Sequence, residues 1–141
     1  ALFNSFGRIL AGFLSDKIGR VQTLTLACFL SVGGNVLLYL CGKGDLILFY
    51  SGISIVGICF GAFMGVFPGF TADQFGAAHN SVNYGIMFIG FAMAWYFGPT
   101  IMKNVYYKNG FYTQAFLIAA GLSVAGIILT VLYRMCKKRE K

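Results

Sequence analysis

Arg8 and Asn4 are the residues of this sequence whose types and spacing best suit the binding of a small anion. Arg8 lies in an apolar segment, and Asn4 precedes it by one helical turn. The planar guanidinium of an arginine matches a carboxylate through two parallel hydrogen bonds. Asn4 is placed either to hold the guanidinium or to touch the ligand. We therefore treat the two as a candidate anion site; the alternative is a structural pairing of Arg8 with another helix.

A second group of charges surrounds a short polar turn that follows this segment. Asp16, Lys17 and Arg20 occupy the turn. The topology described below places one further acidic residue outside the tail, Asp73, on the same side of the membrane as this turn. Arg20 is a candidate partner for Asp73, and Asp16 suits the positive end of a helix, an interaction of about 0.3–1 kcal/mol. The structural alternative is that Lys17 and Arg20 only anchor the chain at a membrane surface.

Residues for other kinds of chemistry are scarce. The four cysteines form no Cys-x-x-Cys pair, and the single histidine, His79, has no cysteine near it, so we expect no metal and no cofactor. No acidic residue lies deep in an apolar stretch, which argues against a membrane enzyme. The net charge of +7 comes from only 15 charged residues without a basic groove, so we expect no nucleic-acid partner.

The elements that must position these residues are membrane-spanning helices. Of the 141 residues, 58% are hydrophobic and 11% are charged, against roughly 25% in an average soluble domain. Four uncharged stretches each exceed the roughly 20 residues that cross a bilayer as a helix. We predict an all-α integral membrane protein with spans at about 21–42, 46–70, 81–103 and 111–133, and a partial span at 1–15.

The distribution of basic residues predicts the orientation of these spans. The turn after the first segment and the C-terminal tail, 134–141, lie on one side and carry seven Lys and Arg, whereas the opposite side carries three: Lys43, Lys103 and Lys108. The positive-inside rule places the richer side, including the C-terminus, in the cytoplasm. Arg8 then lies about 12 Å along a helix from Asp16. An arginine at that depth costs roughly 2.5–3.5 kcal/mol unless it is paired or hydrated.

Glycines mark the faces where helices are expected to pack. Gly57, Gly61, Gly65 and Gly69 recur every four residues and form a glycine stripe along one span. Small residues permit close approach of helix backbones in lipid, so we predict a packing face here. Pro68 is expected to bend or end this helix, and Gly98-Pro99 to kink the next one.

One segment resembles a known signature. Residues 12–20 read Gly-Phe-Leu-Ser-Asp-Lys-Ile-Gly-Arg and match all five specified positions of G-x-L-x-D-x-x-G-R. This resembles the cytoplasmic loop of the major facilitator superfamily, found between helices two and three and again between eight and nine. Four spans follow, so the resemblance implies the C-terminal bundle, from the end of helix eight through helix twelve. It also implies a latch that holds the outward-open state, formed by Gly12, Asp16, Gly19, Arg20 and Asp73.

A second resemblance is to the oxalate–formate antiporter branch and its monocarboxylate porter relatives. It rests on Asp73-Gln-Phe-Gly76, Asn83-Tyr-Gly85, Phe88 and Gly98-Pro99. In those porters an arginine of helix eight binds the substrate carboxylate, and Arg8 has the matching spacing to Gly12 and Asp16.

Two positions depart from the pattern of that branch. Asn4 is neutral where monocarboxylate porters tend to have an acidic residue that assists proton coupling. The middle of helix eleven has no lysine, unlike the oxalate exchanger, and Lys103 lies near the outer end. A single buried cation favours a monocarboxylate, or a dicarboxylate whose second partner lies elsewhere.

These observations predict a secondary active transporter of a small organic anion, a mono- or dicarboxylate, working by alternating access in the cell membrane. Its expected partners are the anion, the lipid bilayer and an N-terminal helical half that this fragment lacks. The alternatives are a major facilitator transporter of an unrelated solute, and a non-transporting membrane subunit or channel.

Overall fold

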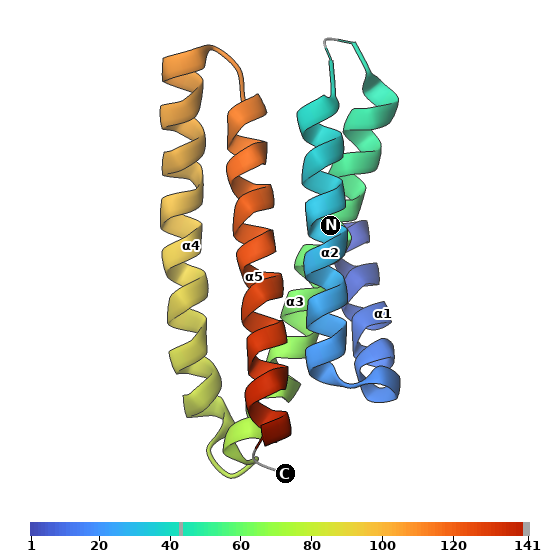
Figure 1. Cartoon of the computed structure of the whole chain (residues 1–141), viewed down its shortest axis with the longest axis vertical. Helices are drawn as coiled ribbons and strands as arrows, with labels where there is room; N and C mark the ends of the chain where they lie inside the picture. The colour runs from blue at the N-terminus through green and yellow to red at the C-terminus, as the bar shows by residue number, and fades with distance from the viewer. Residues whose placement is uncertain (43, 140–141) are drawn as a thin grey trace.

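The chain folds into helices joined by short turns. A computed structural model describes residues 1–42 and 44–139, with side chains through residue 137. All regular structure in those residues is helical: α1 Leu2–Ile18, α2 Arg20–Leu40, α3 Leu46–Phe75, α4 Asn80–Asn109 and α5 Thr113–Arg139 (Figure 1). Lys43 and residues 140–141 lie outside the described residues. The part of the predicted tail at 134–139 continues α5 as helix.

Four of these helices are long and apolar enough to cross a membrane, namely α2, α3, α4 and α5 over residues 113–137. The all-α membrane class predicted from the composition is therefore confirmed. Helices α3 and α4 each have 30 residues, or about 45 Å of helix, so they extend beyond a hydrocarbon core of about 30 Å. Both continue through their internal prolines, Pro68 and Pro99, and α3 ends at Phe75 rather than near residue 70.

Helix α3 is the centre of the packing. Helices α1 and α2 both pack against α3, and α2 also packs against α5, whereas α4 makes fewer contacts, with α3 and α5. The small core contains Ala11, Leu24, Ala27, Ala62 and Val66. No residue of α4 is buried within the described chain, although α4 runs beside α5 (Figure 1). Most large apolar side chains thus face outward, where lipid or further helices can cover them.

The polar turn between α1 and α2 requires a glycine. Gly19 alone separates the two helices and has φ 94°, a conformation that residues with a Cβ rarely adopt. Its N–H donates to the Ser15 carbonyl at 3.0 Å, which closes the last turn of α1. This turn, the turn between α3 and α4, and the C-terminal part of α5 lie at one end of the molecule, which we call the basic end (Figure 1).

Candidate functional site

Helices α1 and α3 approach so closely that their glycines face backbone. A Cβ placed on Gly7 would collide with the carbonyl of Ile58, and one on Gly61 would collide with the carbonyl of Asn4. A Cβ on Gly65 would lie 2.9 Å from the carbonyl oxygen of Arg8. Gly61 and Gly65 of the glycine stripe therefore lie directly against the backbone of Asn4 and Arg8. This contact holds both residues in place by sterics and dispersion, without relying on a polar anchor.

The remaining predicted packing residues have different surroundings. A Cβ at Gly57 would lie 3.4 Å from the Cβ of Phe3, so this glycine also faces α1. A Cβ at Gly69 would collide with the guanidinium of Arg20. Because glycine has no Cβ, the Arg20 side chain fits beside it. On α4, a Cβ at Gly98 would meet nothing within 4 Å, and Pro99 is exposed.

Asn4 holds Arg8 at one nitrogen of its guanidinium. Its Nε donates to Asn4 Oδ1 at 3.0 Å, and the side chain is exposed. Within the described residues, the two terminal amino groups of Arg8 have no protein partner. The ion pair in this part of the chain joins Arg20 to Asp73 instead. Asn4 thus orients the guanidinium while leaving the donors that form a bidentate pair with a carboxylate.

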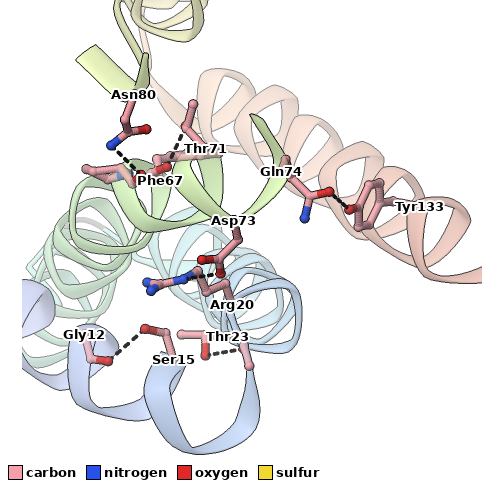
Figure 2. Close-up of polar contacts among 12 residues, drawn as sticks. Gly12, Ser15, Arg20, Thr23, Phe67, Thr71, Asp73, Gln74, Asn80 and Tyr133 are labelled. Atoms are coloured by element: carbon pink, nitrogen blue, oxygen red, sulfur yellow. Dashed lines mark hydrogen bonds and ion pairs between the residues drawn. The ribbon is translucent and has the colours of Figure 1, made fainter. Parts of the chain in front are cut away.

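Arg20 and Asp73 connect distant parts of the chain at the basic end. Arg20 Nε lies 2.5 Å from Asp73 Oδ2, joining the start of α2 to the last turn of α3 across 53 positions of sequence (Figure 2). Their side chains are 29% and 54% exposed, so the pair contributes about 1 kcal/mol or less to stability. Its effect is geometric, because it fixes the α1–α2 turn against the end of α3.

The other residues of the predicted latch lie nearby without joining this pair. Asp16 is exposed in the last turn of α1 and has no ion-pair partner in the described part of the chain. The carbonyl of Gly12 accepts a hydrogen bond from Ser15 Oγ at 2.8 Å (Figure 2). Gly19 forms the turn itself.

The whole chain matches one known protein family. The model of the Major Facilitator Superfamily matches residues 1–141. The chain belongs to the Major Facilitator Superfamily. It is similar to the oxalate:formate antiporter of Oxalobacter formigenes, at 30% identity over 99% of this chain and 34% of that protein. It is also similar to the uncharacterized MFS-type transporter YhjX of Escherichia coli K12, at 32% identity over 66% of this chain and 23% of that protein.

This Major Facilitator Superfamily chain spans about a third or less of the length of these curated relatives. No solved structure matches it. The family predicted from residues 12–20 is therefore confirmed, and so is the similarity to the oxalate:formate antiporter. The relatives are transporters, and the helices described above make this chain an integral membrane protein.

A cavity of about 790 Å³ lies between α2, α3, α4 and α5. Arg8 and Asn4 are not among its lining residues, and no charged side chain is. Its lining therefore offers a carboxylate no cation to bind. Its aromatic lining consists of Phe60, Phe63, Phe67, Phe70, Tyr84, Phe88, Phe91 and Tyr133.

Some polar contacts between helices of the bundle were not predicted from the sequence. Ser31 Oγ of α2 lies 2.9 Å from Ser123 Oγ of α5, and buried Asn35 donates to the Ser31 carbonyl at 2.8 Å. At the basic end, the Tyr133 hydroxyl donates to Gln74 Oε1 (Figure 2). Polar residues within or at the ends of apolar spans were the signal that would have found them.

The start of α4 is joined to α3 by a side-chain hydrogen bond. His79 precedes the helix without a side-chain cap, and the Asn80 amide donates instead to the Pro68 carbonyl at 3.4 Å. Asn80 therefore ties the start of α4 to α3 (Figure 2). For metals, the described residues contain no group of three or more His, Cys, Asp or Glu side chains able to hold an ion.

Proposed function

We propose that this chain is part of a secondary active transporter for a small organic anion, a mono- or dicarboxylate. The observation that carries the proposal is the guanidinium of Arg8, with Nε bound to Asn4 and its terminal amino groups unoccupied. The similarity to an oxalate:formate antiporter supports a carboxylate as the ligand. The role of Asn4 would be to set the plane of the guanidinium through Oδ1, which leaves its Nδ2 group as a donor for the bound anion.

Alternating access would use the close contact between α1 and α3. An anion bound to Arg8 neutralises a charge that is costly inside a bilayer, so the loaded site crosses between its two orientations more easily than the empty one. Because the glycines of α3 touch the backbone of Asn4 and Arg8, α1 and α3 would carry the site as one body. Binding and movement, without covalent chemistry, then suffice for function.

The second part of the proposal is a latch formed by Gly12, Asp16, Gly19, Arg20 and Asp73. The Arg20–Asp73 pair would hold the turn against α3, and Asp16 would face the positive end of a helix in the other half of the protein. Such a contact at the basic end would favour the outward-open state, and its release would allow the basic end to open.

The proposed placement in the whole protein follows the same reasoning. The chain would supply the end of helix eight through helix twelve in the cell membrane, with the C-terminus and the basic end in the cytoplasm. An N-terminal helical half would complete the site. A major facilitator transporter of an unrelated solute is the second candidate, because the family match by itself specifies no solute.

Uptake into proteoliposomes by the complete protein tests the proposal. Labelled formate, acetate, oxalate and succinate would be compared with a neutral sugar of similar size. We expect saturable uptake of at least one carboxylate, inhibited by the others and accelerated by carboxylate loaded inside. Saturable uptake of the sugar alone would contradict the substrate class. A steady ionic conductance without saturable uptake would indicate a channel instead.

A further inference from the structure

Two consecutive side chains at the end of α3 hold two different helices. Asp73 binds Arg20 at the start of α2, and Gln74 accepts a hydrogen bond from the Tyr133 hydroxyl of α5. Figure 2 shows the two side chains leaving the same turn in different directions. The last turn of α3 is therefore fixed between the α1–α2 turn and α5.

This turn needs such support because of its position in the helix. It follows Pro68, which has no N–H to donate to the preceding turn, and it precedes Gly76, where the helix ends with φ 84°. The Gly76 N–H donates to the Ala72 carbonyl at 2.9 Å, but the carbonyl groups that follow Ala72 in this turn have no partner within the helix, and helix ends of this kind open readily. In this helical conformation the turn presents the carboxylate of Asp73 to Arg20.

Tyr133 is itself held in a defined position. Its ring contacts the ring of Phe70 edge-on at a centroid distance of 5.8 Å, and Lys137 Nζ lies 5.8 Å from the centre of the Tyr133 ring. An aromatic side chain with two rotatable bonds, packed in this way, presents its hydroxyl in one direction. The hydroxyl therefore forms a fixed point on α5 to which Gln74 attaches.

We propose that Tyr133 is a positioning residue of the latch: by binding Gln74, it keeps the last turn of α3 helical and so aims Asp73 at Arg20. The effect of Tyr133 on the Asp73–Arg20 contact does not depend on the proposed function; only its effect on transport does. It follows that α5 influences the α1–α2 turn without touching it, and that loss of a single hydroxyl on α5 loosens a turn more than 100 positions away in sequence.

Hydrogen exchange in the complete transporter tests this coupling. The exchange of backbone amides in peptides covering residues 15–23 would be compared in wild type, Tyr133→Phe and Asp73→Asn. Tyr133→Phe removes the donor but keeps the ring against Phe70 and beneath Lys137. Because Tyr133→Phe loses one hydrogen bond of ordinary strength, we expect the amides of residues 15–23 to exchange about two- to tenfold faster than in wild type.

The double variant and two controls make the test specific. Because Tyr133 acts through Asp73, Tyr133→Phe/Asp73→Asn should exchange no faster in this turn than Asp73→Asn alone. Gln74→Met, which keeps the length of the side chain but removes the acceptor, should reproduce Tyr133→Phe. Tyr112→Phe, at the opposite end of the bundle, is the matched control and should leave residues 15–23 unchanged.

The outcomes separate this inference from the proposed latch. Faster exchange confined to the segments around residues 74 and 133, or effects of the two substitutions that multiply in the double variant, would overturn the positioning role. Uptake by the same variants is measured in parallel. If Asp73→Asn transports normally, the latch is wrong, while the exchange data still decide whether Tyr133 positions the turn.

Discussion

The carbonyl of Asn4 lies against the α-carbon of Gly61, so closely that a Cβ at position 61 would collide with it. This contact joins the glycine stripe of α3 to the segment of α1 that carries the candidate anion site. The packing of two helices and the position of Arg8 therefore depend on the same residues.

Gly61→Leu should lower the melting temperature of the complete protein in detergent. The added side chain has no space beside the Asn4 carbonyl, and forced overpacking costs about 1–3 kcal/mol. Gly33→Leu on α2 is a matched control, because a Cβ at Gly33 meets nothing within 4 Å. An unchanged melting temperature for Gly61→Leu would show that α1 and α3 are not held together here.

Arg8→Lys should weaken carboxylate binding while leaving the protein folded. Lysine keeps the positive charge but loses the planar fork and the Nε donor to Asn4. The loss of a charge-assisted hydrogen bond of about 1.5–3 kcal/mol corresponds to an affinity roughly ten- to a hundredfold weaker. Binding across a panel of mono- and dicarboxylates measures the effect, with yield and melting temperature as controls. Wild-type affinity for every transported anion would refute the substrate role.

Asp16→Lys should reduce turnover without lowering stability. Asp16 is exposed and has no ion-pair partner in the described residues, so its replacement breaks no contact within this bundle. An effect on transport must then come from a contact made elsewhere in the protein. Uptake normalised to inserted protein is the measurement, and Lys17→Ala on the same turn is the control. Normal turnover of Asp16→Lys would remove Asp16 from the latch.

Ser123→Ala should destabilise the contact between α2 and α5 modestly. The substitution removes the hydrogen bond to Ser31, and such bonds between membrane helices average about 0.6 kcal/mol. Ser31→Ala should cost a similar amount, and the double variant should cost less than the sum of the two single effects. Unfolding in mixed detergent gives these values. Additive effects would mean that the two hydroxyls do not interact in the membrane.

The helical membrane class and the family could be predicted from sequence because both depend on local features. A long uncharged stretch exceeds the thickness of the hydrocarbon core whatever its neighbours do. Residues 12–20 are contiguous, so the signature that they carry is visible without a fold. A pairing of Arg20 with Asp73 could also be suggested, because few charges compete on that side of the membrane.

The sequence alone determined that this chain crosses a membrane as helices and belongs to a transporter family, whereas the tertiary structure decided which faces meet. In lipid, apolar side chains cover every face of a span, so hydrophobic periodicity does not reveal the buried one. Only the fold placed Gly61 against Asn4, and Gln74 against Tyr133. The glycine stripe indicated a packing face on α3, but which residue of another helix meets it depends on the arrangement of whole helices, which no local pattern encodes.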